Sequence, residues 1–422
     1  TYSYVDEGLE VTETQKNAVD GNNIVTTLDY NVQSIIEKCI LEYNEEKPSK
    51  NTAVVVADPS NGEILGMASY PTFNLNDPRK LTGMYTDEEI KDMSDEEYRN
   101  NLYSLWTNYC VSESYEPGST FKPVTVASAL EEGVVKDGDT YVCKGFETVA
   151  DYKLKCHVFS TIGSHGSLTV EQALMNSCNP YMIHLALEMG NSRFAYYQSL
   201  FGFGKITGID LPGETTGIVY GDRMTTIDAA CNSFGQTINV NMMQMMAAYC
   251  SIINGGMLYQ PHIVKRIESA NGEVVKEYKA NLVRQTITAS TSKLLRRYLK
   301  NTVEEGTAKK AGVTGYSVAG KTGTAQKGDR KDNKWIISFI GHAPAENPKF
   351  AIYVVIDEPY GTTGTSGSSA DVLTLTHNIL EKLLPYMNVY KDASDEYEDT
   401  SSSPDELTAV SYTHHRAHET VL

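Results

Sequence analysis

Ser119 and Lys122 are the first residues whose types and spacing suggest chemistry. They lie in the stretch EPGSTFKP at residues 116–123, and side chains three positions apart share one face of a helix. Because Pro123 is tolerated only in the opening turn of a helix, we expect Ser119 at the helix N-terminus, where free backbone N–H groups favour an anion. A serine at that place could act as a nucleophile. The same residues also fit an N-cap serine beside a solvated lysine, so the choice depends on the rest of the chain.

Two later motifs favour the nucleophile. Ser177-Cys178-Asn179 falls between two predicted helices, and Lys321-Thr322-Gly323-Thr324 falls on a predicted strand, where glycine permits close backbone approach by a ligand. Ser-x-Asn and Lys-Thr-Gly are each common by chance. Their order after S-x-x-K, in the contexts of helix start, interhelical turn and strand, is specific for penicillin-binding proteins and active-site-serine β-lactamases.

The predicted elements place these motifs in an α+β fold. A helix is expected to begin at Thr27 or Asp29, and a hairpin is expected to span residues 52–69. Thr169 and Gln172 form a capping-box pattern, and Pro180 is expected to start the next helix. Strands at both ends of the chain with helices between them indicate an antiparallel sheet beside a mostly helical lobe. The other expected elements are helical patterns at 220–254, 291–304 and 371–384, strands at 316–326, 334–344 and 349–359, a polar insertion at 74–110, and a Cys/Gly-rich loop at 138–168.

The composition of the 422-residue chain excludes some classes of function. Its net charge of −18 argues against nucleic acid or an anionic membrane surface as the main partner. No stretch of the sequence approaches the 18 or so uncharged apolar residues that a membrane span needs. The seven cysteines include no C-x-x-C pair, and an odd number cannot pair completely within the chain, so cysteine content does not decide the compartment.

The chain resembles the transpeptidase domain of class B penicillin-binding proteins, of the elongation, septation or sporulation type. EPGSTFKP, SCNP and AGKTGTAQ carry this resemblance, together with AVVVADPSNGEILGMASYPTFN, GIDLPGE and the run from Trp335 to Pro359. It covers residues 24–388 and implies the penicillin-binding transpeptidase or serine β-lactamase-like fold, with a five-stranded antiparallel sheet flanked by helices. Such proteins have a pedestal domain, so residues 1–23 are expected to be a pedestal remnant or a linker. Residues 389–422 are expected to be an acidic disordered tail or a non-native end.

The resemblance implies a peptidoglycan D,D-transpeptidase at the outer face of the bacterial cytoplasmic membrane, anchored by an N-terminal segment outside this chain. Ser119 would be acylated by the D-Ala-D-Ala stem peptide of a lipid-linked or nascent glycan strand, and an amine of a neighbouring peptide would resolve the acyl-enzyme. β-Lactams would trap Ser119, catalysis would need no cofactor, and a membrane glycosyltransferase would be the partner. Two rivals stay open: a D,D-carboxypeptidase or serine β-lactamase, which uses water as acceptor, and a non-catalytic β-lactam sensor.

The resemblance also implies how protons move. Lys122 would take the proton of Ser119, which requires a neutral amine. Exclusion from water and the second cation, Lys321, would both lower the pKa of Lys122. Ser177 would relay the proton towards the leaving amine, and Asn179 would hold the substrate amide while contacting Lys122.

Substrate recognition is assigned by the same resemblance to the third motif. Lys321, Thr322 and Thr324, with Gly323 between the two threonines, would bind the terminal carboxylate of the stem peptide. The backbone N–H groups of Ser119 and Thr324 would form the oxyanion hole.

Three cysteines and one histidine that lie within 36 residues suggest a metal site: Cys143, Cys156, His165 and Cys178. Thiolates and an imidazole in that number suit a closed tetrahedral zinc site, although the spacing C-x12-C-x8-H-x12-C fits no standard zinc finger. Some elongation-type relatives resemble this in binding zinc through the same segment. A zinc ion here would be structural and would hold the loop at 138–168 against the Ser177 turn. A Cys143–Cys156 disulfide with a free Cys178 is the alternative, and His157 is a competing ligand.

Glu214 and the Gly/Ser run at 361–372 are the remaining candidates. Glu214 follows Ser177 by 37 residues and invites comparison with a deacylating glutamate, but the E-x-x-L-N pattern of class A β-lactamases is absent. We therefore interpret Glu214 as structural. The Gly/Ser run is interpreted as a flexible connection, and by family position it could lie near the active-site cleft.

Overall fold

The computed structural model describes residues 20–81, 85–328, 334–359 and 368–393, together with the backbone of residues 2–5 and 11–14. Most of the Gly/Ser run at 361–372 and most of the expected tail at 389–422 lie outside the described residues. The first residues of that tail are packed, because Val389 is buried and the Asp392 carboxylate accepts hydrogen bonds from the backbone and hydroxyl of Ser317.

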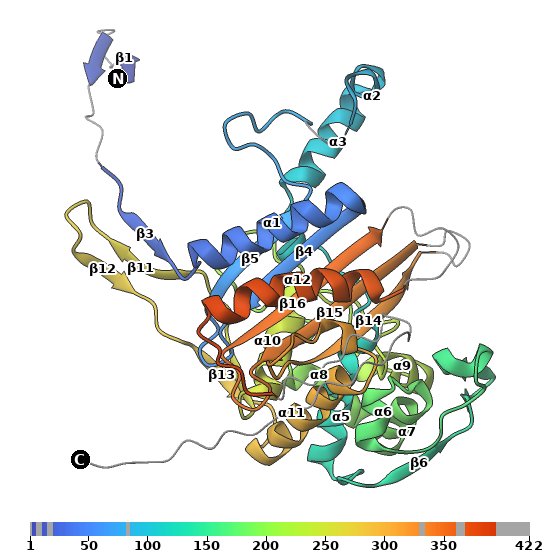
Figure 1. Cartoon of the computed structure of the whole chain (residues 1–422). Helices are drawn as coiled ribbons and strands as arrows, with labels where there is room; N and C mark the ends of the chain where they lie inside the picture. The colour runs from blue at the N-terminus through green and yellow to red at the C-terminus, as the bar shows by residue number, and fades with distance from the viewer. Residues whose placement is uncertain are drawn as a thin grey trace, which may run out of the picture.

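A five-stranded antiparallel sheet, in the order β14-β15-β16-β4-β5, forms the centre of the molecule (Figure 1). β16 pairs with β4, so the sheet joins strands from the two ends of the chain, as predicted. Alternate residues of β4 face two cores: Val54 and Val56 pack on one side, and Val55 and Ala57 on the other. The strands are β4 (Ser49–Ala57), β5 (Ile64–Tyr70), β14 (Ala319–Lys327), β15 (Lys334–Ala343) and β16 (Phe350–Pro359).

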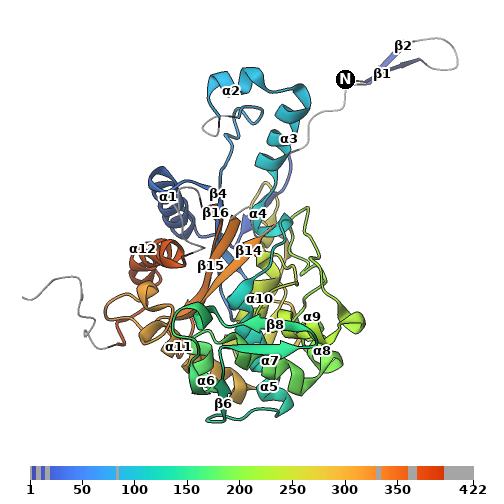
Figure 2. The same cartoon turned by 90° about the vertical axis from the view of Figure 1, so that its right-hand side faces the viewer.

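Helices α1 (Tyr30–Glu46) and α12 (Ala370–Tyr386) lie side by side on one face of the sheet (Figures 1 and 2). The carboxylate of Asp29 accepts hydrogen bonds from the backbone N–H groups of Asn31 and Val32 and caps α1. The second of the two predicted helix starts is therefore confirmed.

A mostly helical lobe covers the other face of the sheet and carries the first two motifs. The predicted capping box at Thr169 and Gln172 begins α6, and Pro180 lies in the first turn of α7 as predicted. The helical pattern predicted at 220–254 contains the short turn η3 and the helices α9 and α10, and Asn241 caps α10. The elements are α4 (Tyr109–Ser112), η1 (Gly118–Phe121), α5 (Lys122–Glu132), α6 (Val170–Met175), α7 (Asn179–Met189), α8 (Asn191–Leu200), η3 (Gly221–Arg223), α9 (Thr226–Asn232), α10 (Met242–Ile253), α11 (Ala289–Glu304) and η4 (Lys309–Ala311).

The expectation of an irregular loop at 138–168 is wrong, because this segment forms two small antiparallel pairs. β6 pairs with β9, and β7 pairs with β8. Strands of four residues carry little readable period, and here they are stabilised by pairing with each other. The elements are β6 (Thr140–Cys143), β7 (Phe146–Val149), β8 (Tyr152–Lys155), η2 (His157–Ser160) and β9 (Gly166–Thr169).

Small strands also occupy residues 255–290, where the sequence indicated no element. β11 pairs with β12 and with the N-terminal β3, and β10 pairs with β13. A further pair, β1 with β2, lies near the N-terminus. These strands are β1 (Tyr2–Val5), β2 (Val11–Thr14), β3 (Asn23–Thr26), β10 (Met257–Tyr259), β11 (Val264–Glu268), β12 (Val274–Glu277) and β13 (Leu282–Gln285).

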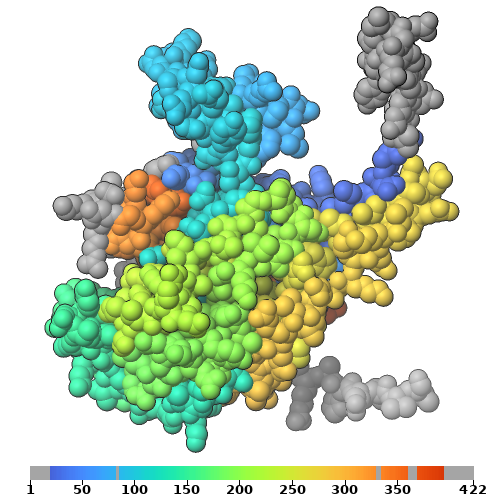
Figure 3. Space-filling model, turned by 180° about the vertical axis from the view of Figure 1, so that it is seen from behind, coloured from blue at the N-terminus to red at the C-terminus, as the bar shows by residue number. Residues whose placement is uncertain are grey.

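The polar insertion predicted at 74–110 forms an arm that projects from the body of the molecule (Figures 2 and 3). It contains α2 (Asp87–Asp92) and α3 (Asp95–Trp106). The arm has a small apolar core of its own, built around three leucines: Leu81, Leu102 and Leu105. Among the helices of the described residues, none is long and apolar enough to cross a membrane.

Candidate active site

Ser119 lies at the start of the helix that the sequence predicted. The short turn η1 leads directly into α5, and the backbone N–H of Lys122 donates to the carbonyl of Ser119. Pro123 is in the first turn of α5, and Gly133 ends the helix with a left-handed φ of 74°. Ser119 is partly exposed whereas Lys122 is fully buried, so the hydroxyl is open to a substrate and the amine is screened from water.

The amine of Lys122 joins the first motif to the second. It donates to the carbonyl of Ser177 at 2.6 Å, to the hydroxyl of Ser177 at 3.0 Å and to Oδ1 of Asn179 at 2.7 Å. Burial lowers the pKa of Lys122 to about 8, while the sulfurs of Cys156 and Cys178 oppose this change. Burial is one of the two causes that the sequence predicted for this lowering, and the charge of Lys321, the other, is not among the causes of the Lys122 shift.

The amine of Lys321 joins the third motif to the same hydroxyl. Lys321 is fully buried in β14 and donates to Ser177 Oγ at 3.0 Å and to the carbonyl of Thr322 at 3.2 Å. Burial and, second, the charge of Lys122 lower the pKa of Lys321 well below its ordinary value. The Ser177 hydroxyl therefore lies between two amines that cannot easily both be charged.

The turn at Ser177 has a backbone conformation that orients its side chain. Ser177 has a φ of 54°, in the left-handed region that non-glycine residues rarely adopt. Hydrogen bonds from the N–H groups of Ser177 and Cys178 to carbonyls at the end of α6 stabilise the turn. Asn179 then begins α7, and its amide donates to the carbonyl of Lys155 at 3.3 Å. This contact between β8 and the second motif was not predicted.

The glycines of the first and third motifs let two backbones meet. A Cβ on Gly118, whose φ is +56°, would lie 2.5 Å from the carbonyl oxygen of Thr324 and 3.2 Å from its nitrogen. A Cβ on Gly323 would lie 2.8 Å from the carbonyl oxygen of Pro117 and 2.5 Å from the hydroxyl of Ser338. The missing side chain of Gly323 therefore makes room for η1 and β15.

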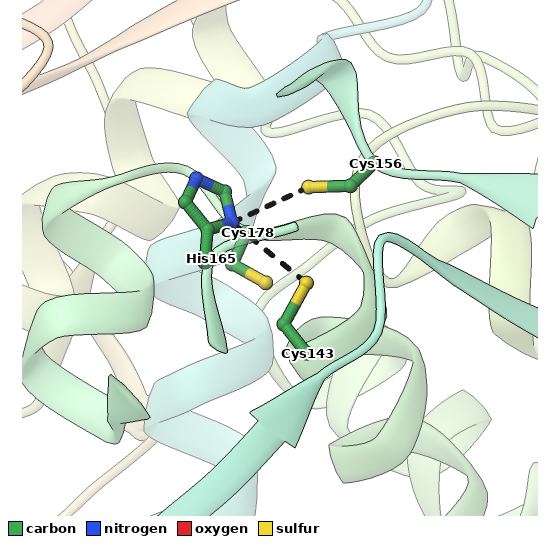
Figure 4. Close-up of side chains that lie close together, drawn as sticks. All are labelled: Cys143, Cys156, His165 and Cys178. Atoms are coloured by element: carbon green, nitrogen blue, oxygen red, sulfur yellow. Dashed lines mark hydrogen bonds between the residues drawn. The ribbon is translucent and has the colours of Figure 1, made fainter. Parts of the chain in front are cut away.

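The four predicted metal ligands converge (Figure 4). The potential ligand atoms of Cys143, Cys156, His165 and Cys178 all lie within 4.8 Å of one another. His165 Nδ1 is 3.8 Å from the sulfur of Cys143 and 3.6 Å from that of Cys156. A hydrogen bond with Cys178 lowers the pKa of Cys156, and burial lowers the pKa of His165, so a thiolate and a neutral imidazole are favoured. The described cysteines, Cys143 and Cys156 included, are free thiols.

Glu214 has the structural role that the sequence indicated. Its carboxylate accepts hydrogen bonds from the backbone and hydroxyl of Thr207 and from the backbone of Gly208. Glu214 thus stabilises the loop from Thr207 to Glu214 by joining its two ends.

Comparison with known proteins agrees with this geometry. Residues 52–381 match the model of the penicillin-binding protein transpeptidase domain. The chain belongs to this family. The resemblance stated from the motifs and the predicted fold are both confirmed.

Relatives in the family include a sporulation protein and a peptidoglycan D,D-transpeptidase. The chain is 38% identical over 377 residues to stage V sporulation protein D of Bacillus subtilis. This match covers 88% of this chain and 54% of that protein. It is 29% identical over 398 residues to the peptidoglycan D,D-transpeptidase FtsI of Escherichia coli. This match covers 93% of this chain and 60% of that protein. The crystal structure of penicillin-binding protein 3 from Mycobacterium tuberculosis with aztreonam is 27% identical, with a TM-score of 0.76 over 91% of this chain and 83% of that one. The chain thus spans little more than half the length of these curated relatives.

Proposed function

We propose that residues 24–388 are a peptidoglycan D,D-transpeptidase domain with Ser119 as the acylated nucleophile. The observation that carries the proposal is the Ser177 hydroxyl, which lies 3.0 Å from the amines of both Lys122 and Lys321. One hydroxyl thereby links the three sequence motifs, which are far apart in the chain. The name of the Escherichia coli relative, peptidoglycan D,D-transpeptidase, supports the same activity.

The proposed reaction runs through an ester on Ser119. Neutral Lys122 takes the hydroxyl proton, and Ser119 Oγ attacks the carbonyl carbon of the D-Ala-D-Ala peptide bond. When the tetrahedral intermediate collapses, that C–N bond breaks, and Ser177 relays the proton held by Lys122 to the leaving amine of D-alanine. An amine of a second stem peptide then attacks the ester carbonyl and gives a proton to neutral Lys122. The ester C–O bond breaks, the cross-link amide forms, and Ser119 regains its proton from Lys122.

The two lysines divide their roles when substrate binds. A substrate carboxylate beside Lys321 favours the charged form of that amine. A charged Lys321 in turn disfavours a second charge on Lys122, because both amines are buried around one hydroxyl. Binding of the carboxylate therefore leaves Lys122 as the free base that the reaction requires.

The oxyanion hole in this proposal consists of the backbone N–H groups of Ser119 and Thr324. The close approach of the Gly118 and Thr324 backbones supports it, since it brings the start of η1 against β14. One such donor is worth about 3–4 kcal/mol of transition-state stabilisation in enzymes of known mechanism.

The substrate and setting follow from the family in our proposal. The donor would be the D-Ala-D-Ala end of a stem peptide on a lipid-linked or nascent glycan strand. The domain would act at the outer face of the cytoplasmic membrane, beside a membrane glycosyltransferase. The complexes of the Mycobacterium tuberculosis relative with aztreonam and ampicillin support acylation by β-lactams.

We also propose that Cys143, Cys156, His165 and Cys178 hold a structural zinc ion. Zinc bonds of about 2.3 Å to sulfur and 2.05 Å to nitrogen in a tetrahedron place these atoms about 3.6 Å apart. The two S···Nδ1 distances of 3.8 and 3.6 Å fit this requirement before any ligand moves. Three thiolates and one imidazole would complete the site and leave no open position, so the ion would stabilise the fold rather than act on substrate.

The test of the proposed function is labelling by a fluorescent penicillin, followed by peptide turnover. We expect one label per chain in the wild type and none in Ser119→Ala, with an unchanged melting temperature. A D-Ala-D-Ala peptide should give a cross-linked product when an acceptor amine is present. Persistent labelling of Ser119→Ala would contradict the assignment of the nucleophile.

The rival functions are separated in the same experiment. Hydrolysis without any use of the acceptor amine would favour a carboxypeptidase, and labelling without peptide turnover would favour a sensor. Repeated turnover of penicillin would favour a β-lactamase. For the transpeptidase we expect the penicilloyl adduct to persist long after free drug is removed.

A further inference from the structure

We infer that Thr307 is a positioning residue for recognition of the terminal carboxylate of the substrate, an inference that rests on the proposed function. Thr307 lies in the turn between α11 and η4 and belongs to none of the three motifs. It contacts Thr322 of the third motif and Met175, which lies two residues before Ser177 of the second motif.

Thr307 ties the end of α6 to the third motif. Its backbone N–H donates to the carbonyl of Met175 at 3.3 Å, and its hydroxyl donates to the same oxygen at 3.4 Å. The hydroxyl of Thr322 donates to the hydroxyl of Thr307, also at 3.4 Å. Since Met175 precedes Ser177 by two residues, one side chain spans from the support of the Ser177 turn to β14.

The neighbouring Gly306 shows that this turn is pressed against α6. A Cβ on Gly306 would lie 2.7 Å from the Cγ of Met175, 2.8 Å from its carbonyl oxygen and 2.8 Å from the carbonyl of Thr302. A residue with a side chain would have to move away from α6. Backbone packing at Gly306 therefore helps to fix this turn independently of the Thr307 side chain.

The direction of these hydrogen bonds gives Thr307 its proposed role. Because its proton points to Met175, the oxygen of Thr307 faces Thr322 as an acceptor and limits the rotation of that hydroxyl. A separation of 3.4 Å is long for a bond between hydroxyls, so it can be replaced. A carboxylate accepts a shorter and stronger, charge-assisted bond. Thr307 thus holds the Thr322 hydroxyl within reach of the carboxylate site until an anionic substrate accepts the hydrogen bond from that hydroxyl.

The test compares two penicillins that differ only at the carboxylate: the free acid and its methyl ester. Acylation rate constants are measured for the wild type, Thr307→Val, Thr307→Ser and a control, Thr374→Val, whose hydroxyl bonds only within α12. We expect Thr307→Val to slow reaction with the free acid about tenfold and to leave the methyl ester within about twofold. Thr307→Ser should restore the free-acid rate, and Thr374→Val should change neither.

Gly306→Ala is the control that shows the effect of displacing the whole turn. We expect it to slow both compounds and to lower the melting temperature, because it moves the whole turn. Equal losses with both penicillins in Thr307→Val, or no loss with either, would overturn the inference. These results are distinct from failure of the proposed function, which would appear as a wild type that penicillin does not label at Ser119.

Discussion

The amines of Lys122 and Lys321 are both fully buried, and both donate to the Ser177 hydroxyl at 3.0 Å. A buried amine loses the hydration that stabilises its charge, and two of them around one hydroxyl also repel each other. The chemistry of the site therefore depends on which amine holds the proton. In the proposed mechanism, a bound carboxylate would favour the proton on Lys321 and leave Lys122 as the base.

The pKa of Lys122 predicts the pH dependence of acylation. Only neutral Lys122 can accept the Ser119 proton, and burial lowers its pKa to about 8 in the free protein. The second-order rate constant reports the free protein, so we expect it to fall about tenfold per unit as pH drops below 8 and to level off above it. Stopped-flow acylation between pH 6 and pH 9 measures this, with tryptophan fluorescence as the control for folding. A flat profile over that range would contradict the role of Lys122.

Motif spacing predicted the residues that do the proposed chemistry, but not those that support them. The proposed reaction requires particular side-chain types, and their pattern can be recognised in the sequence alone. These residues are Ser119, Lys122, Ser177 and Lys321. The carbonyl of Lys155 and the hydroxyl of Thr307 act through contacts between distant segments. Any residue has a carbonyl, and threonine is common in turns, so the sequence carried no signal for either.

At the scale of elements, the contact between η1 and β14 sets the proposed oxyanion hole. Gly118 has a φ of +56° and no room for a Cβ against Thr324. The two N–H donors of the hole belong to these two elements, one before α5 and one within the sheet. Their spacing is therefore a property of backbone packing, which a single methyl group can disturb.

Gly118→Ala is expected to remove most acylation. The new Cβ would meet the Thr324 carbonyl at 2.5 Å, so η1 and β14 must separate. Loss of alignment with one oxyanion donor lowers the rate about 10²- to 10³-fold. The matched control is Gly133→Ala, at the other end of α5, where φ is +74° and nothing lies within 4 Å of an added Cβ.

Both variants carry the cost of a left-handed alanine, about 1 kcal/mol, and should lose similar stability from that source. Only Gly118→Ala should lose acylation by penicillin. A Gly118→Ala protein that reacts at the wild-type rate would show that the hole does not depend on this contact.

Elements with strong local signals were predicted, and those held by tertiary pairing were not. The cap at Asp29, the capping box at Thr169 and the proline Pro180 are local features, and each marks the expected boundary. The pairs β6–β9 and β7–β8 consist of strands of four residues, too short for a period to be read. Each strand is stabilised by hydrogen bonds to its partner strand. Because the partners are separated in the 138–168 segment, this pairing cannot be predicted from local sequence.

At the scale of the whole molecule, two features connect the segment from β6 to β9 with the second motif. Cys178 of the cluster is the middle residue of the second motif, and the carbonyl of Lys155 accepts a hydrogen bond from Asn179. The segment itself contributes Cys143, Cys156 and His165. A zinc ion would thus close a loop of chain onto the turn that carries Ser177, and its effect should extend beyond its own ligands.

Zinc removal is therefore expected to lower both stability and acylation. We expect about one zinc per chain in protein purified without added metal, and a melting temperature that falls by several degrees in Cys143→Ser, with metal lost. Cys231→Ser is the matched control, because Cys231 lies outside the cluster and should keep both zinc and stability. Acylation by penicillin should slow in Cys143→Ser, since Asn179 and Ser177 lose a support, although neither residue is changed. Protein with almost no zinc and a Cys143–Cys156 disulfide in mass mapping would reject the metal site in favour of the disulfide.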